Sequence, residues 1–565
     1  MNGTNPILSS MSEVENEIFE IWKEFDPAAA FTAGIEECAG KVFIPSEANI
    51  NSLKARIETA TGKATQDNQT KLLRCMNMTL EFQEPHRVIS TARDVAFAHI
   101  VKEGINTRHI SQLAENIEKA ISASKNELQD RKWATELKVV TCQSSDDLKG
   151  LLKTIASETK DEVLKKKISK LTDIVNDYRK TFEVEGIVEG DFTEVFPVLE
   201  KSGGDIGHRA VYPKILKYMF DYYETPQQIE TKALRQLRKE LPRLNRVVAK
   251  LAKVYGCQPT VEEVTKSMTK KTQIPKSKIM EFVSNIRKKI LAVLGEDLVR
   301  ITPKYDTRVI ETPSYLVNFI PSAATGAFNL LTNKPFSIFF LTTDEKRSPP
   351  TGAADVIQTI VHEETGHCVH FQNSSTAYGG KPDLVDLLDS SLGYAISDGI
   401  SFHREYEFMA LLKQLAAKDK AKLSETEKEF LDALKGCSTL SESLLENEFI
   451  LMHWRIVRFL RAIFDSRVNM GKQSVVEFVK WASEQTGIDE KTVFSQTFMF
   501  LDRVGYAPVY FIVGDVLREI QEKALENGVN LLDFNTYATS IGYGARTHFE
   551  SKLKEFIKER KGKKR

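Results

Sequence analysis

The sequence has no long hydrophobic run, because charged and polar residues interrupt every apolar stretch well before the ~18 residues that a membrane-spanning helix needs. Its first residues, Met1 to Pro6, also lack the charged segment followed by an apolar stretch that is typical of a secretion signal. These absences predict a cytoplasmic protein that does not bind a membrane.

An excess of charge of either sign is also missing. Lys plus Arg and Asp plus Glu each number 78 among the 565 residues, so the net charge is zero. Without a global field, neither nucleic acid nor an anionic surface is favoured as a partner. The short basic tail from Lys558 to Arg565 is interpreted as a solvated helix end, and the expected partner is neutral or mixed in charge.

Cysteine is scarce and scattered. The sequence contains six cysteines and no CxxC pair: Cys38, Cys75, Cys142, Cys257, Cys368 and Cys437. Such a pattern is typical of reduced thiols in a cytosolic protein rather than of a disulfide framework.

Strand signals are rare, and helical patterns fill most of the chain, with apolar residues three and four positions apart over Met11 to Phe25 and Asn106 to Leu128. The sequence therefore predicts a mainly α fold, and its 41% of hydrophobic residues suffice for a large core. A glycine-rich polar run around residues 185–205 suggests a boundary between an N-terminal helical region (1–190) and a catalytic region (191–565). The alternative is one continuous two-lobed helical body.

One stretch, about residues 309–343, has β character. Tyr315 to Ile320 and Phe336 to Leu341 are rich in branched and aromatic residues and are bounded by turn-forming residues. We expect a small sheet beside the helix that follows, with Phe336 to Leu341 as an edge strand to which a peptide substrate can add.

The chemistry is predicted in the segment that follows, where His362-Glu363-Glu364-Thr365-Gly366-His367 resembles the His-Glu-x-x-His zinc signature with one extra residue. Side chains five positions apart on a regular α-helix diverge by roughly 140°. Convergence of His362 and His367 on one metal ion therefore requires a π-bulge, and Gly366 accepts such a distortion most easily.

A rival set of ligands needs no bulge. Glu363, His367 and His370 lie four and three positions apart and share one face of a regular helix. This set ranks second, because it leaves no obvious general base.

A zinc site usually adds a third ligand, and the downstream helical segment from Ala395 to Glu405 supplies carboxylates. Further on, Arg503 and Tyr506 are candidates for stabilising the negative charge that peptide hydrolysis builds on the carbonyl oxygen. An arginine can equally clamp the C-terminal carboxylate of a substrate. The alternative is that neither residue has a functional role, with Arg503 exposed on the surface and Tyr506 packed in the core.

The chain resembles the metallopeptidase-like family catalogued as domain of unknown function eight-eight-five. Members carry a His-Glu-x-x-Pro-Gly-His signature, then a segment like Val-Glu-Gly-Trp-Ala-Leu-Tyr-Ala-Glu, and later an Arg followed by a Tyr-x-x-Gly ending. The counterparts here, in the same order, are His362 to His367, Ile396 to Glu405 and Arg503 to Gly514. The shortened motif is also similar to that of dipeptidyl peptidase III, which indicates that the longer spacing can bind zinc.

The resemblance implies a large zincin-type helical peptidase with a deep cleft. It also implies Asp398 as the third zinc ligand, although the family has Glu at this position. Glu405, seven residues on and nearly on the same helix face, is the reserve ligand. His403 is a candidate neighbour that supports the ligands or the transition state.

These predictions combine into a zinc metallopeptidase that acts on short peptides as a carboxypeptidase or oligopeptidase. His362, His367 and Asp398 (or Glu405) hold Zn²⁺, and Glu363 is the general base for the water that attacks the peptide bond. Two alternatives are an inactive helical scaffold or binding protein derived from such a peptidase, and a helical adaptor. The oligomeric state is not indicated by the sequence.

Overall fold

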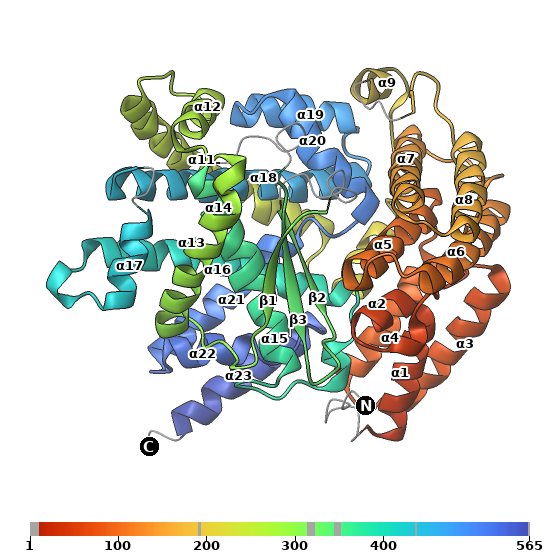
Figure 1. The fold of residues 1–565 in the computed structure, drawn as a ribbon, viewed down its shortest axis with the longest axis horizontal. Coiled ribbons are helices and arrows are strands. Elements are labelled where there is room, and N and C mark those ends of the chain that lie inside the picture. Colours follow the sequence, from red (N-terminus) through yellow and green to blue (C-terminus); the bar gives the residue numbers. More distant parts are fainter. Residues whose placement is uncertain (1–10, 190–193, 314–322, 344–351, 435–437, 563–565) are drawn as a thin grey trace.

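The computed structural model describes residues 11–189, 194–313, 323–343, 352–434 and 438–562. It is mainly helical, as predicted, and has one small three-stranded sheet at its centre (Figure 1). No helix in these ranges combines the length and the apolar character that crossing a membrane requires. The five cysteines within them, Cys38, Cys75, Cys142, Cys257 and Cys368, are free thiols.

The N-terminal helices lie together on one side of the molecule (Figure 1). Their bounds are α1 Glu13–Phe25, α2 Pro27–Thr32, η2 Glu36–Cys38, α3 Glu47–Lys63, α4 Asp67–Glu81, α5 Pro85–Glu103, α6 Thr107–Leu128, α7 Thr135–Glu158 and α8 Glu162–Thr181. Helix α1 begins where Ser12 and Glu15 form a capping box, which satisfies free N–H groups of the first turn.

Along the chain, five helices lie between this region and the first strand: α9 Val195–Ser202, α10 Tyr212–Met219, α11 Pro226–Tyr255, α12 Val261–Thr272 and α13 Lys276–Asp297. Helix α11 begins with the capping box of Thr225 and Gln228 and with Pro226 in its first turn, where proline is favoured.

The sheet contains β1 Thr307–Glu311, β2 Ala323–Phe328 and β3 Phe336–Leu341 in the order β1-β3-β2. β1 pairs with β3 in parallel and β2 pairs with β3 antiparallel. Phe336 to Leu341 was predicted as an edge strand, and this prediction is wrong, because β3 is the central strand. The other predicted strand, residues 315–320, lies outside the described residues.

The central position of β3 follows from its composition. Ile338 and Phe340 pack into a hydrophobic cluster with N-terminal helices, whereas Phe339 and Leu341 pack on the other face with α13. A strand that is buried on both faces typically has a nearly continuous run of apolar residues, and β3, with the sequence Phe-Ser-Ile-Phe-Phe-Leu, has such a run.

The remaining helices surround the sheet and carry the predicted site. Their bounds are α14 Ala353–Thr359, η4 Ile360–Cys368, α15 Val369–Ser375, η5 Leu384–Leu387, α16 Ser391–Ala417, η6 Lys420–Lys422, α17 Glu425–Leu434, α18 Leu440–Asn469, α19 Val475–Thr486, α20 Glu490–Phe498, η7 Met499–Arg503, α21 Val509–Glu526, α22 Leu531–Ala538 and α23 Arg546–Gly562. The largest hydrophobic cluster runs from Ile18 in α1 to Phe556 in α23, so one core joins both sides of the boundary predicted near residue 190. The division into two regions itself stays a prediction.

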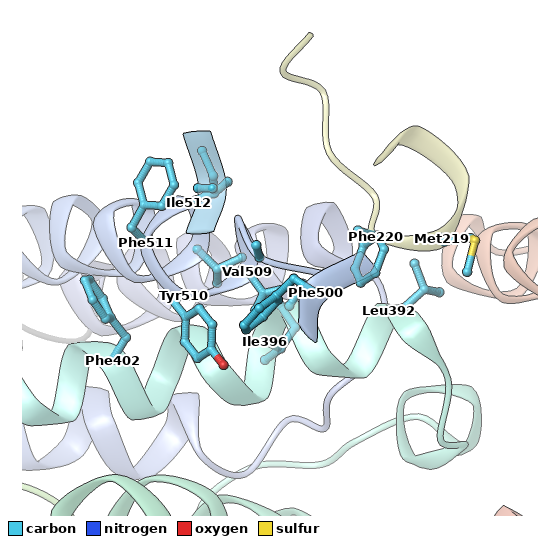
Figure 2. Packing of buried hydrophobic residues seen from close by; sticks show 14 of the residues in the cluster. Met219, Phe220, Leu392, Ile396, Phe402, Phe500, Val509, Tyr510, Phe511 and Ile512 are labelled. Carbon is cyan, nitrogen blue, oxygen red and sulfur yellow. The ribbon is translucent and has the colours of Figure 1, made fainter. Parts of the chain in front are cut away.

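Helix α16 is the centre of the site region. A Cβ atom on Gly399 would lie 2.6 Å from Val513, and one on Gly514 would lie 2.7 Å from Phe402, so glycines allow α16 and α21 to approach closely. Figure 2 shows apolar side chains at this contact, with Ile396 and Phe402 from α16 on the side of Val509 and Tyr510 from α21. This packing fixes the position of α16 relative to the segment that carries Tyr506.

Candidate metal centre

The two histidines of the motif converge as predicted, because their helix is irregular. Residues Ile360 to Cys368 form the π-helix η4, which continues α14 and leads into α15. The extra residue per turn brings His362 and His367 to the same side, with ring centroids 5.0 Å apart.

Gly366 permits the close packing of this π-helix on α16. A Cβ atom on Gly366 would lie 2.7 Å from Cα of Ser401, which is closer than real Cβ contacts. Glycine is therefore needed here for the approach of the backbone, and this approach brings α16 carboxylates to the histidines.

Asp398 on α16 completes a group of three possible ligands. Its Oδ1 atom lies 3.8 Å from Nε2 of His362 and 3.6 Å from Nε2 of His367. The ligand atoms of the three residues all lie within 4.8 Å of one another. Ligand atoms of a tetrahedral zinc site are separated by about 3.4 Å when each lies about 2.1 Å from the metal. Two imidazoles and one carboxylate at these separations fit zinc.

The other nitrogen of each ring is held by a neighbour. Nδ1 of His362 lies 2.7 Å from Oε1 of Glu405, and Nδ1 of His367 lies 2.6 Å from Oγ of Ser397. When Nδ1 carries the proton for these hydrogen bonds, the lone pair of Nε2 points towards Asp398. Both rings are thus fixed through Nδ1, and each Nε2 lies on the side of Asp398.

Glu405, the reserve ligand, has a different position from the one predicted. Both of its oxygens are used, one by His362 and the other by Arg458, which donates at 2.7 Å. Glu405 therefore supports His362 from behind and is not part of the group of possible ligands. The positive charge of Arg458 and the hydrogen bond to His362 outweigh burial and lower the pKa of Glu405 to about 2.

His403, the other predicted supporting residue, points elsewhere. Its Nε2 atom lies 3.5 Å from Oε1 of Glu407, on a different side of α16 from Asp398. Five positions on a regular α-helix separate two side chains by roughly 140°, and α16 has no bulge that would compensate. The role predicted for His403 is not supported by this placement.

The rival set of ligands is not brought together. His370 is buried, and its Nε2 atom forms a 3.1 Å hydrogen bond with the backbone oxygen of Gly542. Within the described ranges, it belongs to no group of residues that is arranged to hold a metal ion.

Glu363, the predicted base, lies at the edge of the sheet. Its Oε2 atom accepts a 2.7 Å hydrogen bond from Oγ1 of Thr325 in β2, and its charge acts on His367. Glu364 instead faces α13, where it is buried and bonded to Arg287 and Tyr305. The two adjacent carboxylates thus have separate tasks, and Glu364 anchors η4 to the helices behind it.

Tyr506 reaches the centre from the segment before α21. Its hydroxyl donates a 2.6 Å hydrogen bond to Oδ2 of Asp398, the oxygen that does not face the histidines. Burial and the nearby negative charge of Asp398 raise the pKa of Tyr506 well above its ordinary value, so the phenol keeps its proton. Arg503 is further away, with its guanidinium 5.8 Å from the ring of Tyr506 and 4.0 Å from Asp94.

Three residues of this arrangement were not predicted: Thr325, Ser397 and Arg458. None of them lies in the segment from His362 to His367, but each forms a hydrogen bond with a predicted residue. Ser397 directly precedes Asp398, so the sequence could have indicated that it lies near the ligands. The pairing of Arg458 with Glu405, in contrast, depends on how α18 packs against α16.

A second group, formed by Asp383, Asp386 and His548, also has ligand atoms within 4.8 Å of one another. Here a lysine supplies the cation, because Nζ of Lys552 lies 2.9 Å from Asp383 and 3.1 Å from Asp386. This group is interpreted as an ion-pair cluster that attaches α23 to the segment around η5.

Comparison with known proteins finds no matching family model and no matching curated protein. Two solved structures share the fold. A candidate lipoprotein from Colwellia psychrerythraea aligns with a TM-score of 0.64 and 13% identity over 97% of this chain and 100% of its own. A candidate lipoprotein of unknown function from Shewanella oneidensis aligns with a TM-score of 0.63 and 15% identity over 96% of this chain and 99% of its own. These similarities show the fold over nearly the whole chain.

Proposed function

We propose that this protein is a zinc-dependent peptidase, similar to the metallopeptidase-like family that the sequence motifs resemble. The observation that carries the proposal is the convergence of His362, His367 and Asp398, with Nδ1 of each histidine held by a neighbouring side chain and each Nε2 on the side of Asp398. A zinc ion bound there would supply Lewis acidity and lower the pKa of a bound water.

Residues of this chain have separate roles in the proposed reaction. Glu363 lies next to His367 and takes a proton from the attacking water, which it passes to the leaving amine. Thr325 keeps the Glu363 carboxylate oriented through its 2.7 Å hydrogen bond. Tyr506 keeps Asp398 oriented, and Arg458 keeps Glu405 ionised against His362.

The substrate backbone is proposed to bind along β2 rather than β3. Within the described residues, β2 pairs with β3 on one side and with no strand on the other, and Thr325 lies on it beside Glu363. An extended peptide that adds to this free edge would pass the general base.

A location in the cytoplasm stays a prediction, which cell fractionation tests.

The test combines metal analysis with one substitution. We expect about one zinc per chain, hydrolysis of short peptides that a chelator abolishes, and loss of hydrolysis with zinc retained in Glu363→Gln. A purified protein without zinc, or unchanged turnover in Glu363→Gln, would contradict the proposal and favour the inactive scaffold.

A further inference from the structure

A pocket of about 410 Å³ lies between the N-terminal helices and the segments that carry the candidate centre. Pockets that bind small ligands typically have volumes of about 300–1,000 Å³, so this one is large enough for part of a peptide. Tyr506 lines the pocket, and its hydroxyl donates a hydrogen bond to Asp398. One wall of the pocket therefore adjoins the candidate metal ligands.

The deep part of this pocket is apolar. One face of α5 contributes Val88, Ala92 and Val95, which lie three or four positions apart along the helix. The end of α10 adds Met219 and Phe220, both labelled in Figure 2. Of these five residues, all but Val88 are buried. They form an apolar floor.

Several charged side chains of the wall lie at its exposed rim. The side chains of Asp94 and Arg503 are 53% and 52% exposed and lie 4.0 Å apart, and Asp389 is exposed as well. Asp502 is less exposed and accepts a 2.8 Å hydrogen bond from the hydroxyl of Ser90. An apolar lining with a few polar groups is typical of a pocket that binds a mainly apolar ligand.

The two other charged residues of the wall are engaged within this chain. Asp26 caps α2 by accepting a 2.9 Å hydrogen bond from the N–H of Ala29. The guanidinium of Arg87 lies 5.2 Å from the centre of the Phe82 ring. The surface that is left for a ligand is therefore chiefly the apolar floor.

The pocket also adjoins the end of β2, the strand along which the substrate backbone is proposed to bind. The N–H of Asn329, directly after β2, donates a 2.8 Å hydrogen bond to the backbone oxygen of Thr32, which lines the pocket. Phe328, the last residue of β2, lies three positions after Thr325, the partner of Glu363. Since a strand rises about 3.3 Å per residue, a peptide on this edge reaches the pocket about 10 Å from the general base.

We propose that this pocket binds a large apolar side chain of the substrate, aromatic or long aliphatic. The inference rests on the proposed peptidase function and names its substrate class: short peptides with such a residue within about three positions of the bond to be cleaved. Transfer of an apolar side chain from water to the floor is favourable, whereas a polar side chain of the same size loses its hydrogen bonds with water.

The test is calorimetric binding to full-length Glu363→Gln protein in the presence of zinc. The probes are N-acetyl-Ala-Leu-Ala-amide, N-acetyl-Ala-Phe-Ala-amide and N-acetyl-Ala-Asn-Ala-amide, and the side chain of Asn is close in size to that of Leu. We expect at least one apolar probe to bind about tenfold or more tightly than the Asn probe. The better of the two shows whether the pocket prefers an aliphatic or an aromatic side chain. Equal binding of all three would overturn the inference.

Variants locate the effect. Ala98 is half-buried on the pocket face of α5, so Ala98→Phe fills the pocket and should reduce the preference about tenfold. Ala416→Phe adds the same ring at a half-buried position in the last turn of α16, outside the pocket wall, and should leave the preference intact.

A second pocket variant guards against a folding defect in Ala98→Phe. Val88→Thr keeps the shape of the side chain but places a hydroxyl in the wall, so the preference should fall here too. An unchanged preference in both folded pocket variants, or in Val88→Thr alone where Ala98→Phe does not fold, would overturn the inference.

Hydrolysis by the unsubstituted protein separates this inference from the proposed function. Hydrolysis without any preference for an apolar residue near the cleaved bond would contradict the pocket assignment alone. An apolar preference that depends on the pocket wall, in a protein that hydrolyses no peptide, would contradict the peptidase alone.

Discussion

Oε1 of Glu405 and Nδ1 of His362 lie 2.7 Å apart, in a pair that joins α16 to the π-helix η4. The second oxygen of Glu405 accepts from Arg458 at 2.7 Å, so the carboxylate has no free oxygen for a metal ion. Its effect on the centre is therefore indirect: it holds the His362 ring with Nε2 towards Asp398.

We expect Glu405→Gln to weaken zinc binding by about 10-fold to 100-fold, because the partner that orients a histidine ligand typically contributes this much. Titration against a competing chelator measures the change. Glu407→Gln is the matched control, since Glu407 is buried on the same helix and accepts hydrogen bonds that a glutamine can also accept. Unchanged affinity in Glu405→Gln would refute the orienting role.

Tyr506→Phe removes the hydroxyl that donates to Asp398 at 2.6 Å and leaves the ring in place. Because the hydroxyl holds Asp398 in position, we expect the affinity for zinc to fall about tenfold. The same chelator titration tests this, and normal affinity combined with slow turnover at saturating zinc would instead indicate a role in the transition state.

Gly366→Ala should destabilise the protein by about 1–3 kcal/mol, because the new Cβ atom would collide with the backbone of Ser401. Chemical denaturation gives the free energy of unfolding. Gly62→Ala in α3 is the control: no atom lies within 4 Å of its Cβ position, and alanine there should stabilise the helix by about 0.5–1 kcal/mol. Similar effects of both substitutions would show that η4 and α16 are not in tight contact.

The cluster at α23 predicts a dependence of stability on pH. Burial alone would lower the pKa of His548, but hydrogen bonds with Asp383 and Asp386 outweigh it and raise the pKa to about 9. Since this value is above the ~6.5 of an unfolded histidine, the stabilisation is complete below pH ~6.5 and is lost as the pH rises through about 9.

His548→Gln should therefore be less stable than the unsubstituted protein by about 1–2 kcal/mol at pH 6, a value reduced for partial exposure. The difference should nearly disappear by pH ~9.5. Denaturation curves at both pH values test this, and a difference that is independent of pH would assign the loss to packing instead.

Local patterns in the sequence predicted the helices and the irregular site correctly. The five-residue spacing of His362 and His367 required a distortion, and the structure contains a π-helix at this position. The same rule argues against the supporting role predicted for His403, because side chains five positions apart on a regular helix diverge, and the structure pairs His403 with Glu407 instead.

Contacts between distant segments were not predictable in the same way. β2 consists mostly of alanine and glycine, and Thr325 is its only β-branched residue, so its sequence gives little indication of a strand. It forms because β3 offers an edge for pairing. Similarly, Arg458 finds Glu405 only after α18 and α16 have packed, which no local pattern specifies.

The bond from Trp22 to the backbone of Asp389 has a practical consequence for attempts to shorten the protein. A fragment that starts near residue 190 would keep all three candidate ligands, yet it would lose Trp22 and the N-terminal helices that pack against the start of α16. Such a fragment would expose apolar core surface that α1 to α4 normally cover, and aggregation rather than a minimal enzyme is the expected product.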